Sequence, residues 1–286
     1  MKAGGEFSSS PLAPSLVTAT AELEVEVLGL VNQAGADLGD QVSVRRTPEG
    51  QLLVEGIVET DRRKDEVLRA LAPVANSPAV KLKVETVAEA LRAQAKSRPT
   101  SSNPISVERL ESANSKIPAD ADLRRYFAAK GLSGAQLDQS VNQFAARMLD
   151  RSFQALRHAG ALERLAQRFS LEQLRTLDPE ARNKWLGLLR AHAQAVEREL
   201  GNLRRDLGPF TSSGSPGSEE SVRIDNDQDF QEAVHRLFEL CSASDQAVRS
   251  AFTISESSSN ASAIKSTQFF RSLSEAEALA GRISGQ

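Results

Sequence analysis

Three histidines and one cysteine are the side chains of this 286-residue chain with the widest range of chemistry. His158 and His192 both lie in a stretch with helical periodicity, on either side of a break near Arg175. If the chain reverses at that break, two antiparallel helices place the two imidazoles at similar heights. Imidazoles in contact can form a pH-sensitive pair or supply half of a metal site. No carboxylate stands where it would complete a metal site, so the sequence favours the pH-sensitive pair and predicts no metal or other cofactor.

The remaining histidine and the cysteine do not extend that site. His235 and Cys241 are six residues apart on one predicted helix, so their side chains point in different directions. Cys241 follows a leucine and has the surroundings of a small, buried apolar side chain. Because it is the only cysteine, no disulfide can form within the chain.

Alternating acids at residues 225, 227 and 229 look like the start of a calcium-binding loop. Phe230 stands where such a loop needs a glycine, and His235 lies in the region that should supply a distal carboxylate. We therefore expect the three aspartates to favour the start of the helix that follows, where negative charge is stabilised.

Motifs that mark common enzymes are absent from the sequence. It contains no Walker loop, no G-x-G-x-x-G, no G-x-S-x-G and no H-E-x-x-H. The net charge of −3 predicts no nucleic-acid partner, and the arginines of residues 147–168 are not interleaved with exposed aromatic residues. The sequence predicts a non-enzymatic protein, with an enzyme whose site is not recognised as the alternative.

Composition divides the chain into six segments. Residues 1–18 are rich in serine and proline and are expected to be disordered. An α/β domain is predicted over 19–96, a linker over 97–119 and a helical hairpin over 120–210. A second linker covers 211–221, and short helices over 222–286 are expected to pack back on the hairpin. Formal charge varies from −2 over 1–119 to +4 over 120–210 and −5 over 211–286, which is typical of solvated helix faces.

The segment from residue 41 to 59 is the clearest non-helical part of the chain. Val42 and Val44 alternate with polar residues, and Thr47-Pro48-Glu49-Gly50 has the composition of a turn in which glycine takes positive φ. Gly56 interrupts the return strand, as a bulge or a close approach of backbones would. A helix is predicted before this hairpin over 19–38, with a short strand over 22–27 as the alternative. Another helix, capped by Asp61, and a strand over 80–85 follow it. The predicted order is α-β-β-α-β.

The run from Val42 to Val58, with its two glycines, resembles the glycine-centred core of BON domains. The basic helix start Arg62-Arg63-Lys64 and the strand over 79–84 add to the resemblance, which covers residues ~20–90. BON domains are small α/β modules found mostly in bacterial envelope proteins, and they are thought to bind phospholipid or other interfacial partners. The resemblance implies that Arg62, Arg63 and Lys64 contact a lipid phosphate or a partner. The alternative is that they form the solvated first turn of a helix.

Helical periodicity dominates the second half of the chain. Residues 185, 189, 192, 196 and 203 fall near a 3.5-residue spacing, the seam of an antiparallel coiled-coil-like hairpin. Self-association through residues 185–207 is an alternative use of that seam. Beyond it, separate helices are predicted over 230–241 and 245–252, and a final short helix from Ser274 to Ile283.

Together these patterns predict an α+β protein: a small α-β-β-α-β domain, a long antiparallel helical hairpin and short C-terminal helices. The arrangement also resembles the extracytoplasmic C-terminal region of bacterial membrane-bound regulators of the anti-sigma type. That resemblance implies a binding or sensing role through a protein or an envelope component, with contact to a membrane surface. The chain is expected to be soluble as given and periplasmic, with a cytoplasmic location as the alternative.

Overall fold

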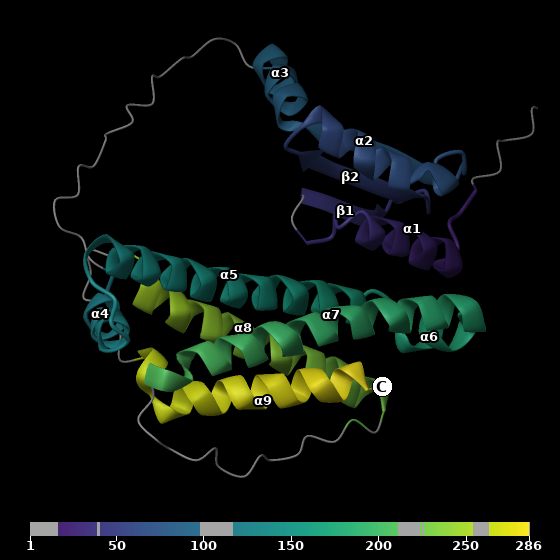
Figure 1. Ribbon diagram of the computed structural model, residues 1–286. Coiled ribbons are helices and arrows are strands. Elements are labelled where there is room, and N and C mark those ends of the chain that lie inside the picture. Colours follow the sequence, from purple (N-terminus) through teal and green to yellow (C-terminus); the bar gives the residue numbers. More distant parts are fainter. Residues whose placement is uncertain are drawn as a thin grey trace, which may run out of the picture. The chain divides into compact units, whose positions relative to one another are not determined.

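The computed structural model describes residues 17–38, 41–97, 117–210, 224, 226–253 and 263–285. The chain divides into two compact units, Met1–Pro99 and Thr100–Gln286, called here the N-terminal unit and the helical unit (Figure 1). The described parts confirm the α+β class. The predicted disordered start and the two predicted linkers lie almost wholly outside the described residues.

The N-terminal unit has the predicted α-β-β-α-β order, followed by one more helix. Its elements are α1 (Ala21–Gln33), β1 (Gln41–Arg46), β2 (Leu52–Val58), α2 (Asp61–Ala70), the 3-10 turn η1 (Ala72–Val74), β3 (Val80–Thr86) and α3 (Val87–Ser97). The strand order is β1-β2-β3, with β2 antiparallel to β1 and parallel to β3. A parallel pair needs a crossover connection, and the segment containing α2 provides it.

Gly50 closes the hairpin turn between β1 and β2 at a φ of 83°. Its N–H donates to the Thr47 carbonyl at 2.9 Å, and its own carbonyl accepts from the Ala19 N–H at 2.8 Å. A Cβ on Gly50 would come within 2.8 Å of Thr18, so both the turn and its contact with the chain before α1 need glycine. Gly56 is different. It pairs with Val42 in an uninterrupted register, so the expectation of a bulge there is wrong.

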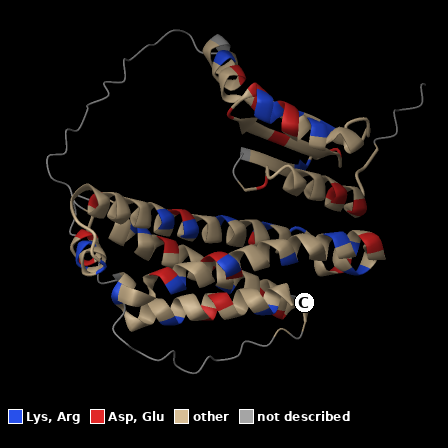
Figure 2. Ribbon diagram, in the orientation of Figure 1, with Lys and Arg blue, Asp and Glu red and all other residues tan. Residues whose placement is uncertain are grey.

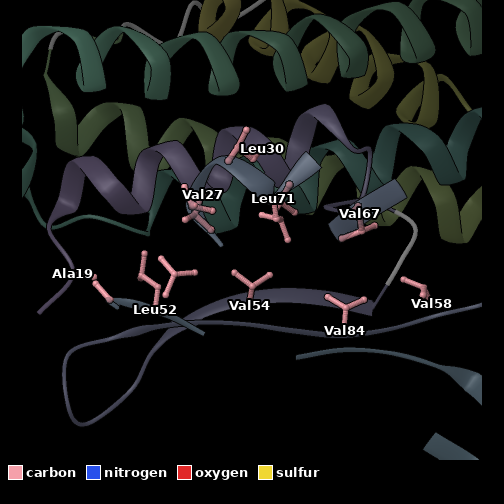
Figure 3. Close-up of a cluster of buried hydrophobic side chains, with 14 residues drawn as sticks. Ala19, Val27, Leu30, Leu52, Val54, Val58, Val67, Leu71 and Val84 are labelled. Carbon is pink, nitrogen blue, oxygen red and sulfur yellow. The ribbon is translucent and has the colours of Figure 1, made fainter. Parts of the chain in front are cut away.

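The core of the N-terminal unit lies between one face of the sheet and the helices α1 and α2. Inward side chains alternate along the central strand: Leu52, Val54 and Val58 are each at most 1% exposed. They pack with side chains of the two helices, and Figure 3 shows the cluster between the strands and the helices above them. The described members are Ala19, Val27, Leu30, Val31, Ala36, Leu52, Val54, Val58, Val67, Leu71, Val74, Ala79, Val80 and Val84.

The N-cap of helix α2 lies one residue earlier in the chain than predicted. Thr60, not Asp61, is the N-cap, and its hydroxyl accepts from the Arg63 N–H at 3.2 Å. Asp61 instead occupies the first turn, where a carboxylate still interacts favourably with the helix dipole. Helix α3 starts with a reciprocal capping box: Thr86 N–H donates to the Glu89 carboxylate at 2.8 Å, and Glu89 N–H donates to the Thr86 hydroxyl at 3.2 Å.

The helical unit contains four long helices that run side by side (Figure 1). Helix α5 packs against α7 and α8, and α9 packs against the same two helices, which closes a four-helix bundle. The elements are α4 (Asp120–Ala129), α5 (Gly134–Ala166), α6 (Leu171–Thr176), α7 (Pro179–Leu207), η2 (Gly208–Phe210), α8 (Asp227–Phe252), η3 (Ala263–Lys265) and α9 (Thr267–Ser284).

Two C-terminal predictions are wrong in their bounds. Helix α8 is continuous over 26 residues, where the sequence suggested a break near Ser242. Cys241 and Val248 are both buried, so the apolar stripe of α8 continues past the expected break. Helix α9 starts at Thr267 with Ser266 as its N-cap, so Ser274 lies inside the helix. Helices α8 and α9 do pack on α5 and α7, as expected. Together the four helices form a bundle.

Glycines let α7 and α9 approach closely at two matching points. A Cβ on Gly201 of α7 would stand 2.9 Å from the Glu277 carboxylate of α9. A Cβ on Gly281 of α9 would stand 3.2 Å from the Glu197 carboxylate of α7. Glu277 is held in turn by Arg204, with Nε 2.6 Å from the carboxylate. Each helix thus lays a glutamate over a glycine of the other.

Candidate functional site

The predicted basic cluster lies at the start of α2, and each of its members has an acidic partner within the N-terminal unit. Arg62 pairs with Glu66 at 3.1 Å, with 90% of the Arg62 side chain exposed. Arg63 also contacts Glu66 and donates to the Ala34 carbonyl at 2.7 Å, which ties α2 to the end of α1. The charged residues of α2 in Figure 2 show the same mixture of signs along the helix.

Lys64 ties α2 to α3. Its Nζ donates to both carboxylate oxygens of Glu89 at 2.8 Å, and Glu89 is the residue that caps α3. The hydrogen bond to Glu89 raises the pKa of Lys64, and the same bond lowers the pKa of Glu89. Arg63 and Lys64 therefore connect elements of the fold. Of the three cluster residues, Arg62 is the one placed mainly in solvent.

Sequence reasoning missed a second surface of this unit, the sheet face opposite the helices. We call it the open sheet face. It carries the outward side chains of all three strands, and the exposed Arg45 and Lys83 flank Glu55 on it. Arg45 Nε lies 2.6 Å from the Glu55 carboxylate, and this hydrogen bond lowers the pKa of Glu55. Its described members are Ser43, Arg45, Leu53, Glu55, Ile57, Lys81, Lys83 and Glu85.

Apolar side chains are exposed at one end of the open sheet face. Ile57 of β2 is 38% exposed and pairs with Glu85, near the end of β3. The chain enters α3 two residues later, and Val87 and Leu91 of that helix are 44% and 60% exposed. Val87 and Leu91 are four residues apart and share one face of α3. The period-2 pattern of β2 could have indicated this surface, because Ile57 lies on the polar side of the alternation.

The two histidines predicted to meet do meet. His158 of α5 and His192 of α7 approach with their Nδ1 atoms 3.1 Å apart, in the seam between the helices. His192 is 1% exposed, whereas His158 is half-buried. Trp185, one of the predicted seam residues, donates its indole N–H to the Leu165 carbonyl of α5 at 3.2 Å. The antiparallel hairpin inferred from periodicity is therefore confirmed in its register.

Burial leaves little of the predicted seam for self-association. Trp185, Leu189, Val196 and Leu203 are all at most 5% exposed, because α5 and α9 cover this face of α7. A second copy could reach these side chains only if the bundle opened.

A buried acid between α5 and α8 was not found from the sequence. Asp245 is 5% exposed, accepts a hydrogen bond from the Ser152 hydroxyl at 2.9 Å and pairs with Arg249 Nε at 2.6 Å. Both Ser152 and Asp245 interrupt apolar helix stripes, and that interruption is the signal that could have revealed them. With its carboxylate engaged by a hydroxyl and a guanidinium, Asp245 fixes the contact of α8 with α5.

His235 links the same two helices at the surface. Its Nδ1 lies 2.7 Å from the Glu163 carboxylate, and its Nε2 lies 3.6 Å from Glu239. The hydrogen bond to Glu163 is the main reason that the pKa of His235 is raised above 6.5, and burial opposes it. A raised pKa stabilises the fold at pH below the unfolded value, and this contribution disappears as pH rises through the folded value.

Glu163→Gln is expected to lower the pKa of His235 toward 6.5, because it removes the charged hydrogen-bond acceptor. Glu239→Gln should lower it less, since that carboxylate lies farther away. Titration of the His235 ring by NMR measures both variants. Equal effects of the two changes would contradict the assignment of the shift to Glu163.

The cysteine and the described members of the three alternating aspartates have ordinary places in the fold. Cys241 is 1% exposed as expected, and burial raises the pKa of its thiol to about 12. Of the three alternating aspartates, Asp225 lies outside the described residues. The N-cap of α8 is Asn226, whose side chain accepts from two N–H groups of the first turn, and Asp229 lies within that turn. Within the described ranges, no three His, Cys, Asp or Glu side chains are grouped to hold a metal ion.

In the part of the chain that the structure describes, no helix combines the length and apolarity needed to cross a membrane. Comparison of the chain with protein-family models, with curated proteins and with solved structures gives no match.

Proposed function

We propose that this chain is a non-enzymatic binding protein whose N-terminal unit recognises a protein partner through the open sheet face and the adjoining face of α3. The observation that carries the proposal is the exposure of three apolar side chains, Ile57 on β2 and Val87 and Leu91 on α3, the helix that follows β3. Binding surfaces combine such exposed apolar groups with a polar rim.

The charges around this apolar end suggest the chemistry of the partner. Lys81 and Lys83 stand at alternate, exposed positions of β3, and Arg45 stands on β1. Glu55 already pairs with Arg45, so acidic groups within the surface do not balance all of its cations. A protein segment with an apolar residue flanked by aspartate or glutamate would complement it. Because β3 is an edge strand, its lysines also disfavour pairing with β3 of a second copy.

The proposal also includes the cellular role and location that the family resemblances imply. The resemblance of residues ~20–90 to BON domains, which are small α/β modules, supports a place for the chain among bacterial envelope proteins. A role in a membrane-bound regulator of the anti-sigma type, and a periplasmic location, are proposed on the same ground. The partner contacts of Arg63 and Lys64 favour the sheet face over the start of α2 as the contact surface.

A photo-reactive amino acid placed at position 57 of the full-length chain, in cells of the source organism, tests the proposal. We expect one discrete cross-linked product, identified by mass spectrometry, and its loss in the Lys81→Glu, Lys83→Glu double variant. The matched control position is Phe153, which is 44% exposed on α5. Purified partner and chain should then bind directly, with the double variant at least about tenfold weaker.

Two results would overturn the proposed surface. One is the same cross-linked product from positions 57 and 153, which would show a non-specific contact. The other is flotation of the purified chain with anionic vesicles, lost in Ile57→Glu, without any protein product. That outcome would assign the surface to a membrane.

A further inference from the structure

We propose that the acidic partner segment binds as an added strand along the outer edge of β3, so that backbone groups as well as side chains recognise it. Strand β3 lies at the end of the sheet, with β2 on one side. An edge strand presents N–H and C=O groups that an extended segment of another protein can pair with. The inference rests on the proposed function and specifies how its partner is bound.

The pairing of β2 with β3 determines which backbone groups lie on the outer edge. The Leu52 N–H donates to the Ala79 carbonyl at 2.8 Å, and the parallel register continues without interruption to the end of β3. Backbone groups of successive residues in a strand point to opposite sides. Ala79 and every second residue after it therefore face β2, whereas Leu82 and Val84 direct their backbone groups outward. Among the described residues, none outside the sheet hydrogen-bonds to the backbone of Leu82 or Val84.

The helix-facing side chains of β3 are less completely covered than those of the central strand. Val80 and Val84 are 7% and 6% exposed, and Leu82 is only partly buried against the core. Leu52 and Val54 of β2 are fully buried. An added strand would extend this apolar layer past the edge, so we expect every second residue of the partner segment to be apolar or β-branched.

Two lysines on the opposite face give the partner segment its charge pattern. Lys81 and Lys83 are exposed, and neither forms an ion pair with a described residue. They stand about 7 Å apart on one face, so two acids at i and i+2 of an added strand would lie directly beside them. Glu85 is the next outward residue, and it pairs with the exposed, apolar Ile57. Glu85 disfavours a third acid, and the position beside it suits an apolar residue.

The other edge of the sheet, β1, has cations that already pair within the N-terminal unit. Arg45 lies 2.6 Å from the Glu55 carboxylate, and Arg46 lies 2.6 Å from that of Glu24. These pairs leave less attraction for an acidic segment than the two lysines of β3 offer. Charge therefore favours β3 as the binding edge, and β1 serves as a control edge within the same sheet.

Hydrogen exchange in the full-length chain tests this binding mode. The probe is a synthetic peptide with capped ends and the symmetric sequence Ile-Thr-Asp-Thr-Asp-Thr-Ile, which presents the same pattern in either direction. At saturation we expect it to slow exchange of the Leu82 and Val84 amides at least about tenfold. The amides of Val42 and Val44 point away from β2 on the control edge, and their exchange should not change.

Exchange of charges provides a matched control for the lysines. The Lys81→Glu, Lys83→Glu double variant should bind the peptide at least about tenfold more weakly. The same variant should bind a twin peptide in which lysine replaces both aspartates. Because both lysine side chains are exposed, the fold is expected to remain intact. Restored binding in the swapped pair would show that the loss comes from charge.

Methylation of the peptide nitrogens separates strand addition from contact with the open sheet face alone. One peptide is methylated on its threonine nitrogens and another on its aspartate nitrogens, with all side chains kept. Only one of these sets faces β3 in an added strand, so one peptide should bind at least about tenfold more weakly than the other. Loss with methylated threonine indicates an antiparallel segment, and loss with methylated aspartate indicates a parallel one.

Equal binding of the two methylated peptides, with the Leu82 and Val84 amides unprotected, would overturn the inference. Absence of peptide binding up to about 1 mM would overturn the charge pattern. The purified partner from the cross-linking experiment allows the same exchange measurement. If that complex leaves both amides unprotected, strand addition is wrong while the proposed surface stands. If the peptide protects them but no cross-linked product forms, the proposed function is contradicted and the strand-binding edge is not.

Discussion

Replacement of Arg46 with methionine is expected to destabilise the N-terminal unit by about 3 kcal/mol. The Arg46 guanidinium pairs with Glu24 of α1 at 2.6 Å and donates to the Ala19 carbonyl at 2.6 Å. Glu24 is 2% exposed, so the substitution would remove a cation that lies against a buried carboxylate. The estimate stands at the lower end for buried ion pairs, because a third of the Arg46 side chain reaches solvent.

Hydrogen exchange of the β2 amides in the full chain measures this loss, since the only tryptophan belongs to the helical unit. Arg45→Met is the matched control. Arg45 is the preceding residue, but it pairs with Glu55 on the exposed face, where solvent screening leaves an ion pair with little effect on stability. Arg46→Met combined with Glu24→Leu should recover much of the loss. Equal destabilisation by Arg45→Met and Arg46→Met would rule out the special role of the buried pair.

Phe169→Ala is expected to cost the helical unit about 3–5 kcal/mol, the range for removal of a buried aromatic side chain. Phe169 follows α5, is 1% exposed and meets Trp185 edge-to-face, with ring centroids 6.3 Å apart. Its removal would leave a cavity where α5 turns toward α6 and α7. Urea unfolding followed by circular dichroism measures the loss of stability, and a shift in Trp185 emission reports the change beside the ring.

Phe153→Ala provides the comparison within α5. Phe153 is 44% exposed, and its ring lies under the guanidinium groups of Arg157 and Arg249. Its truncation removes little buried surface, so a loss below about 1 kcal/mol and an unchanged Trp185 emission are expected. If both variants lost the same stability, the contact of Phe169 with Trp185 could not be an important part of the core.

The sequence alone determined the features that depend on neighbouring residues. Alternation and a turn with glycine at its last position predicted the hairpin, because strand period and positive φ are local properties. The capping box of Ser170 with Gln173 and the N-cap of α7 at Asp178 before Pro179 are local in the same sense, because each joins residues at most three positions apart. The meeting of His158 and His192 also followed from local information, since a single reversal between two regular helices fixes their register.

Only the tertiary structure decided which side chains find distant partners. Lys64 looked like part of a basic surface until Glu89, 25 residues later, took both of its hydrogen bonds. The sequence predicted two separate helices over 230–241 and 245–252, but packing of one continuous apolar stripe on α5 and α9 outweighs a weak local preference. Contacts across many residues depend on how the whole chain closes, which periodicity does not specify. The open sheet face is likewise defined by tertiary packing, because α1 and α2 cover only the other face of the sheet.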